Sequence, residues 1–205
     1  MENLIKAFDE IKQKNLSIDL TRGKPHTDQL DLSNDLITQS VDPIGENGVD
    51  LRNYGEPVGI IEARKLGADI LDSKVELTIA GEQSSYLLMS QLLLGRSLFG
   101  IDNNPWKDDS ESAFLCAVPG FDRHFATLEG LGLQMHTVNL CSSGIDLDDL
   151  NQKLSKYPNI KGLICVPRHS NPSGEVFSDE NIINLLKITK AVSYTHLRAH
   201  ETLPY

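Results

Sequence analysis

Short apolar runs alternate with longer amphipathic stretches in the second half of the chain, and this alternation constrains the fold most. We expect three strands, each followed by a helix: strands at residues 113–118, 133–138 and 160–166, and helices at residues 122–130, 146–157 and 178–190. Strands that alternate with helices of this length favour an α/β fold with a mostly parallel sheet. The third strand is apolar almost throughout, which is typical of a sheet covered on both faces.

The first half of the chain is less regular. Residues 4–14 predict a short amphipathic helix, because their apolar side chains fall near one helical face. Further along we expect extended chain at 16–20, a turn at 21–25, a short helix at 33–39, a loop at 42–54, a helix at 58–71, a β-rich run at 75–80 and a long apolar helix at 84–99. We divide the chain into an N-terminal arm, residues 1–50, and a partial large domain, residues 51–190.

The last stretch, residues 191–205, reads AVSYTHLRAHETLPY and has neither helical nor strand periodicity. It resembles translated read-through of a sequencing adaptor, so we expect it to be foreign to the fold. His196 and His200 stand four residues apart, a spacing that could grip a metal on a helix. Because no third ligand accompanies them, we predict no metal site.

Composition excludes several classes of function. The 205 residues carry a formal net charge of −10, which argues against nucleic-acid or anionic-membrane partners. The longest apolar run, near residues 86–94, is too short to span a bilayer, and the N-terminus lacks the apolar core of a secretory signal. The three cysteines form no CxxC pair, as expected for thiols in a cytoplasmic protein.

Four short segments could bind a ligand, and each has an ordinary structural alternative. Ser84 and Ser85 follow a small-residue turn at the start of a long helix, where an anion is favoured, although either serine could simply cap the helix. Phe121 follows a strand directly and could stack on a flat ring, or it could anchor the core. Asn171 also follows a strand and could donate to a ligand oxygen, or it could form an Asx turn. Arg52 and Tyr54 could meet a phosphate, or they could lie in a solvated loop.

The order and spacing of these segments are more informative than any one of them. The chain resembles the fold-type I, class I-like aminotransferases that depend on pyridoxal 5'-phosphate (PLP), in the branch described as aspartate- or alanine-aminotransferase-like. The resemblance covers nearly all of residues 1–190. Its most specific stretches are CAVPGFDRHF at residues 116–125 and CVPRHSNPSG at residues 165–174, and LTRGKP at residues 20–25 supports them.

The resemblance implies a fold and a function. The fold would be α/β, an incomplete PLP-transferase large domain preceded by an arm. The cofactor would be PLP, the substrates an amino acid and a 2-oxo acid, and the enzyme a cytoplasmic homodimer. The resemblance implies that Ser84, Ser85 and the Gln83 backbone hold the PLP phosphate, that Phe121 stacks on the pyridine ring, and that Asn171 hydrogen-bonds its phenolic oxygen. Tyr54 would reach the phosphate of the cofactor in the neighbouring subunit. The Gly23 backbone would lie near the substrate carboxylate, with Arg22 or Lys24 as further candidate contacts.

Two departures from the family qualify this interpretation. Glu82-Gln83 stand where related sequences carry Gly-Asn, and we expect Glu82 to point away from a phosphate because like charges repel. The lysine that would hold the cofactor covalently should follow residue 190, after a further strand beyond the SNPSG turn, and none can be placed there. We therefore name no catalytic residue and expect the chain as given to be inactive. The alternative is a non-catalytic PLP- or phosphate-binding module that uses Ser84, Ser85, Phe121 and Asn171. A dinucleotide binder is disfavoured, because no GxGxxG or Walker motif appears.

Overall fold

A computed structural model describes residues 2–17, 24–81, 84–101 and 103–191. The chain divides into two compact units, Met1–Arg52 and Asn53–Tyr205, and each is described by itself. The predicted extended segment and turn between residues 16 and 25 fall largely outside the described residues, and so does the tail after residue 191. The boundary between arm and large domain stays a prediction.

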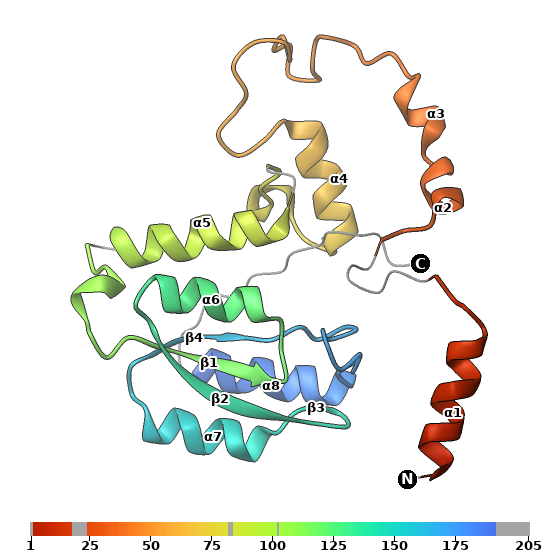
Figure 1. Cartoon of the computed structure of the whole chain (residues 1–205). Helices are drawn as coiled ribbons and strands as arrows, with labels where there is room; N and C mark the ends of the chain where they lie inside the picture. The colour runs from red at the N-terminus through yellow and green to blue at the C-terminus, as the bar shows by residue number, and fades with distance from the viewer. Residues whose placement is uncertain (1, 18–23, 82–83, 102, 192–205) are drawn as a thin grey trace. The chain divides into compact units, whose positions relative to one another are not determined.

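The first unit contains three short helices, α1 (Glu2–Gln13), α2 (Thr27–Asp31) and α3 (Asn34–Ile37) (Figure 1). The predicted amphipathic helix is confirmed as α1, and α3 lies inside the short helix expected at 33–39. The second helix, α2, was not predicted. It begins with a reciprocal cap, in which the His26 side chain accepts from Asp28 N while Gln29 Oε1 accepts from His26 N. Histidine is not among the preferred N-cap residues, so the sequence signal for this helix is weak.

The second unit is built on a four-stranded sheet. Its strands are β1 (Ala113–Val118), β2 (Gln134–Cys141), β3 (Gly144–Ile145) and β4 (Ile160–Ile164), in the order β3-β2-β1-β4. β1 pairs in parallel with both β2 and β4, whereas β2 and β3 form an antiparallel pair. The three predicted strands and their mostly parallel arrangement are confirmed. The two-residue strand β3 is too short to leave a periodic signal.

Helices precede and follow these strands, and their ends follow ordinary capping rules. They are α4 (Ile61–Leu71), η1 (Val75–Leu77), α5 (Ser85–Leu98), η2 (Trp106–Asp108), α6 (Asp122–Gly130), α7 (Leu147–Lys156) and α8 (Asp179–Ala191). The Asp146 carboxylate accepts from the backbone N–H groups of Asp148 and Asp149 and so caps α7. Ser178 Oγ accepts from Asn181 N and caps α8. Each such cap stabilises its helix by about 1 kcal/mol.

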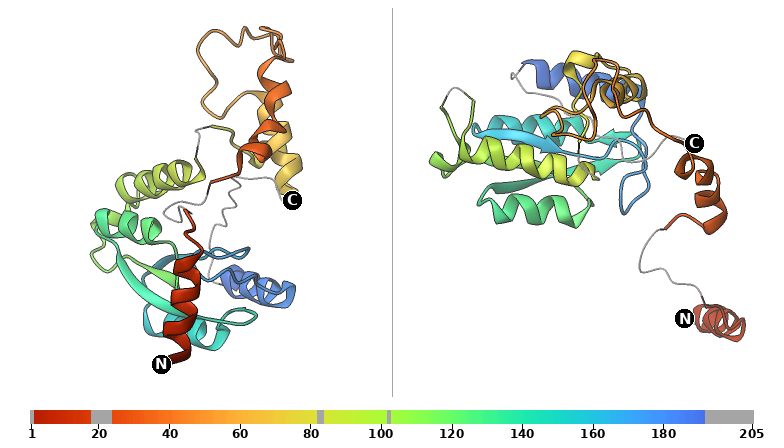
Figure 2. Two further views of the ribbon diagram at one scale, coloured as in Figure 1. Left: turned by 45° about the vertical axis from the view of Figure 1, so that its right-hand side comes forward. Right: turned by 90° about the horizontal axis from the view of Figure 1, so that it is seen from above.

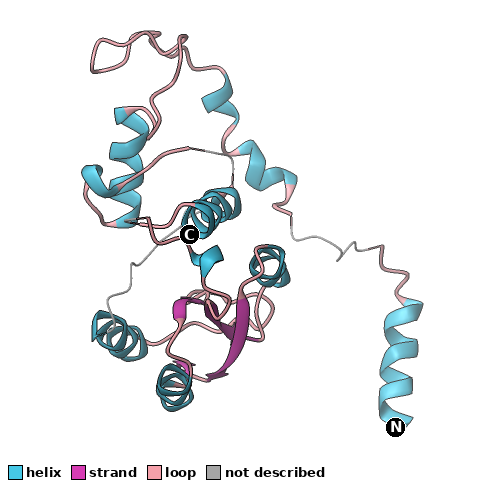
Figure 3. Cartoon of the chain, turned by 90° about the vertical axis from the view of Figure 1, so that its left-hand side faces the viewer, coloured by secondary structure: helices cyan, strands magenta, loops and turns pink. Residues whose placement is uncertain are grey.

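The sheet lies between two layers of helices. Figures 2 and 3 show α5 and α6 side by side on one face, with α7 and α8 on the other. Because successive side chains of a strand point to opposite faces, β1 contributes to both cores. Its residues Ala113, Leu115 and Ala117 pack with the α7–α8 layer, whereas Phe114 and Cys116 pack with Leu93 of α5 and Leu128 of α6. The prediction of a sheet covered on both faces is confirmed.

The predicted β-rich run at residues 75–80 is wrong. Residues Val75–Leu77 form a 3₁₀ turn, and in the extended backbone that follows Ala80 N donates to Val58 O. The Arg64 guanidinium donates to the carbonyl oxygens of Val75 and Thr78, at 2.7 and 2.9 Å. These carbonyls are therefore satisfied by a side chain rather than by a neighbouring strand.

No described helix has both the length and the apolar character needed to cross a bilayer.

Candidate functional site

The two candidate serines lie at the start of α5. Ser84 occupies the N-cap position with extended backbone (φ −147°, ψ 127°), and Ser85 is the first helical residue. The Ser84 carbonyl accepts from the backbone N–H groups of Leu87 and Leu88, but its side chain makes no capping hydrogen bond. Ser84 thus occupies the N-cap position, as the capping alternative predicts, but its side chain does not make the capping hydrogen bond. A helix start concentrates N–H groups and positive dipole charge, which suits a phosphate.

Phe121 lies at the N-cap position of α6, three residues after β1 ends. The turn before it requires glycine, because a Cβ on Gly120 would lie 2.6 Å from Ala117 O and 2.6 Å from the Phe125 ring. Phe125 packs against the core beneath α6, whereas Phe121 is half-buried and belongs to neither core cluster. This arrangement favours the ligand-facing interpretation of Phe121 over the core anchor.

Aromatic and hydroxyl groups join the start of α5 to the start of α6. The Tyr86 hydroxyl lies 2.7 Å from Thr127 Oγ1. The His124 ring stacks on Tyr86, with centroids 6.4 Å apart, and meets Phe121 edge-on at 5.2 Å. Tyr86 and His124 therefore connect the start of α5, where Ser84 and Ser85 lie, to Phe121. Sequence reasoning missed Tyr86 and Thr127, because they come from different helices and share no spacing pattern.

Asn171 lies in the turn that follows β4. Since β1 and β4 are adjacent and parallel, this turn and the Phe121 turn leave the same edge of the sheet. The turn is closed by backbone hydrogen bonds from Ser170 N to Glu175 O (2.9 Å) and from Phe177 N to Pro167 O (2.8 Å). Ser170 is buried, whereas Asn171 is exposed. The amide of Asn171 is thus accessible at the carboxyl edge of the sheet, where ligands bind in open α/β folds.

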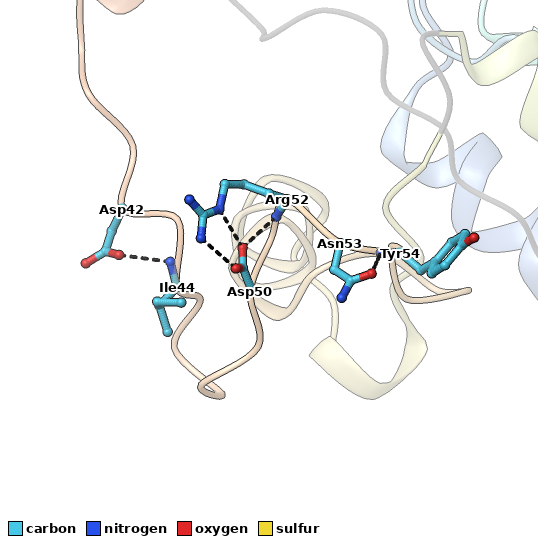
Figure 4. A network of polar contacts seen from close by, with 6 residues as sticks. All are labelled: Asp42, Ile44, Asp50, Arg52, Asn53 and Tyr54. Atoms are coloured by element: carbon cyan, nitrogen blue, oxygen red, sulfur yellow. Dashed lines mark hydrogen bonds and ion pairs between the residues drawn. The ribbon is translucent and has the colours of Figure 1, made fainter.

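Tyr54 and Arg52 differ in how their side chains are engaged (Figure 4). The Arg52 guanidinium donates to Asp50, with Nε–Oδ1 at 2.9 Å and Nη2–Oδ2 at 2.7 Å, and this contact lowers the pKa of the Asp50 carboxyl. The Tyr54 side chain is 96% exposed. The Arg52 guanidinium is thus already paired with a carboxylate, whereas the Tyr54 hydroxyl is accessible.

Some predicted residues lie outside the described part of the chain. These are Arg22, Gly23, Glu82, Gln83, His196 and His200. Within the described ranges, no three histidine, cysteine, aspartate or glutamate side chains gather into a group that could hold a metal ion.

The sequence model of the family described as aspartate amino-transferase matches residues 1–201. The chain belongs to this family.

Individual members agree with the assignment. The aspartate aminotransferase of Corynebacterium glutamicum is 38% identical over 183 residues, which make up 87% of this chain and 42% of that protein. The crystal structure of an aspartate transaminase from the same species matches with a TM-score of 0.75 and 38% identity, covering 87% of this chain and 43% of the other. The α-aminoadipate aminotransferase of Thermus thermophilus, solved with N-(5'-phosphopyridoxyl)-L-leucine, matches in fold alone, with a TM-score of 0.53 and 19% identity over 70% of this chain and 33% of the other.

These matches confirm the predicted fold class. The chain has the α/β architecture of aminotransferase structures and spans less than half the length of the aspartate aminotransferases that it matches. It therefore corresponds to an incomplete aminotransferase large domain with the segment that precedes it.

Proposed function

We propose that this chain forms the cofactor-binding part of a PLP-dependent aminotransferase, which moves an amino group between an amino acid and a 2-oxo acid. One structural observation carries the proposal: contacts through Tyr86, Thr127 and His124 connect the start of α5, where the serine pair lies, to Phe121 at the start of α6. A phosphate site beside an aromatic ring fits a cofactor that carries a phosphate on an aromatic ring. The 38% identity to an aspartate aminotransferase supports the same assignment.

The donor set at α5 matches the phosphate chemically. The two serine hydroxyls would donate to it, and the helix dipole favours the dianion. Phe121 would stack on the pyridine ring, and Asn171 would donate its amide to the phenolic oxygen. When bound, PLP supplies an electron-withdrawing ring that weakens the bonds to the Cα of an amino acid.

The remaining proposed roles involve the neighbouring subunit, the substrate and the lysine that holds the cofactor. Tyr54 would reach the phosphate in a neighbouring subunit of a homodimer, consistent with its exposed side chain. The backbone at Gly23 would lie near the substrate carboxylate. The lysine that holds the cofactor covalently is expected in the part of the relatives that this chain does not match. A cytoplasmic location belongs to the same proposal.

Binding of pyridoxamine 5'-phosphate tests the phosphate site, because this compound cannot form a covalent bond with lysine. In the whole protein that carries this chain, replacing Ser84 and Ser85 with alanine removes two donors to a charged group. We expect affinity to fall at least about tenfold for each hydroxyl removed. Ser155→Ala is the matched control, since the Ser155 hydroxyl donates only to Asn151 O on α7. Equal affinities for the double variant and the control would contradict the proposal.

A non-catalytic binding module would use the same residues but form no covalent bond. Treatment with PLP and then borohydride separates the two functions. A stoichiometric pyridoxyl–lysine adduct in the whole protein supports the enzyme, whereas reversible binding alone supports the module.

A further inference from the structure

A chain of hydroxyl groups connects α5 to the first turn of α6. Thr127 Oγ1 donates to the Arg123 carbonyl oxygen at 3.0 Å. Because a threonine hydroxyl has one proton, the 2.7 Å contact with Tyr86 must use the tyrosine proton, with Thr127 as acceptor. Tyr86 is the second residue of α5, and Arg123 lies two residues after Phe121. The hydrogen bonds therefore run from the serine end of α5 to the Phe121 end of α6.

The His124 ring provides a second connection between the same two points. Its plane lies 19° from that of Tyr86 and 85° from that of Phe121. Tyr86, Phe121, His124 and Thr127 are all half-buried, so their rings and hydroxyls are partly shielded from water. His124 thus contacts one ring beside the serine pair and the ring of the proposed stacking residue.

Ordinary core packing already holds the two helices on the sheet. Leu93 of α5 and Leu128 of α6 are buried in one cluster with Phe114 and Cys116 of β1. Packing of this kind fixes the layer but tolerates small shifts of one helix along its neighbour, and one residue of shift amounts to about 1.5 Å. The polar contact between Tyr86 of α5 and Thr127 of α6 sets that separation more sharply.

We propose that Tyr86, Thr127 and His124 are positioning residues that fix the spacing between the serine pair and the Phe121 ring. The inference rests on the proposed function, because it assigns the spacing to a ligand whose phosphate and aromatic ring belong to one molecule. Such a ligand gains from both sites only when their separation is right, whereas phosphate alone requires the serine pair only. These three residues hold Phe121 and the serine pair in place and need not touch the ligand.

Two probes separate positioning from general stability: pyridoxamine 5'-phosphate and inorganic phosphate. In the whole protein that carries this chain, Tyr86→Phe keeps the ring and removes the hydroxyl. We expect it to weaken binding of pyridoxamine 5'-phosphate about tenfold while leaving inorganic phosphate affinity unchanged. Thr127→Val should do the same. Ser90→Ala is the matched control, because the Ser90 hydroxyl donates to Tyr86 O within α5 and does not reach α6.

His124 offers a test by conservative replacement. His124→Phe keeps an aromatic ring between Tyr86 and Phe121, so the ratio of the two affinities should stay near that of the wild type. His124→Ala should lower binding of pyridoxamine 5'-phosphate alone. Equal loss in both His124 variants, or equal loss for both probes, would overturn the positioning role.

A measurement without ligand distinguishes failure of this inference from failure of the proposed function. In protein labelled with fluorophenylalanine, the ¹⁹F signal of Phe121 can be assigned with Phe121→Leu. We expect Thr127→Val, which adds no phenylalanine, to shift this signal and Ser90→Ala to leave it in place. An unmoved signal overturns the inference even if the cofactor binds. A shifted signal in a protein that binds no pyridoxamine 5'-phosphate would support the coupling of the helices and refute the proposed function.

Discussion

The three cysteines show how the fold sets the chemistry of single residues. Burial raises the pKa of the Cys116 and Cys165 thiols to about 11. Cys141 is exposed at the end of β2, and hydrogen bonds with the Ser143 side chain and backbone lower the pKa of its thiol below the ordinary value. Because the thiolate is the nucleophile, the three side chains should differ in reactivity.

We expect iodoacetamide to modify Cys141 first at mildly alkaline pH. Below the ordinary thiol pKa, a lowered pKa leaves more thiolate on Cys141, whereas a raised pKa keeps Cys116 and Cys165 protonated. Ser143→Ala should slow the labelling of Cys141 and leave the other two unchanged. Mass spectrometry of tryptic peptides over time measures each rate. Equal labelling of all three thiols in folded protein would contradict this expectation.

The candidate site was only partly accessible to sequence reasoning. Ser84, Ser85, Phe121 and Asn171 follow strands or begin helices, so their positions could be inferred from the βα pattern. The contacts among Tyr86, His124 and Thr127 could not, because they depend on how α5 lies against α6. Their roles in binding a cofactor stay predictions.

At the scale of elements, local signals succeeded where burial is regular. The short apolar run of β1 and the amphipathic stretches of α7 and α8 predicted their elements closely. The β-rich run predicted at residues 75–80 does not form a strand. The Arg64 side chain, which is distant in sequence, donates instead to the carbonyl oxygens of Val75 and Thr78. The small strand β3 depends on a contact with α8 that no local pattern encodes.

Asn181 makes that contact. It is buried in α8, and its amide pairs with both backbone groups of Ile145 in β3, accepting from N at 3.0 Å and donating to O at 2.8 Å. Asn181→Ala leaves a buried N–H and a buried C=O without these partners, and we expect a loss of about 2–4 kcal/mol in the free energy of unfolding. Asn184→Ala is the control, because Asn184 pairs with exposed Lys187. Urea denaturation measures both, and similar losses would rule out the proposed anchor.

At the scale of the whole molecule, the described sheet ends at β4, which pairs only with β1 among the described strands. Several apolar side chains of the helices that cover the sheet are exposed, including Leu87 and Leu94 of α5 and Ile183 of α8. Unpaired strand edges and exposed apolar groups favour association. These features fit a chain that spans less than half the length of its relatives.

We therefore expect the 205-residue chain alone to associate at concentrations where the whole protein stays monodisperse. Size-exclusion chromatography with light scattering compares the two directly. A monodisperse sample of the chain with a sharp, cooperative thermal transition would contradict this expectation. It would show that the sheet edge at β4 is stable without further protein packed against it.

The central claim is that residues 1–190 supply the groups that bind the cofactor but not the lysine that holds it. Peptide mapping of the whole protein after treatment with PLP and borohydride tests it most directly. The account predicts one stoichiometric pyridoxyl–lysine outside residues 1–190, and its loss when Ser84 and Ser85 are replaced by alanine. A stoichiometric adduct on a lysine within residues 1–190, or no adduct at all, would contradict it.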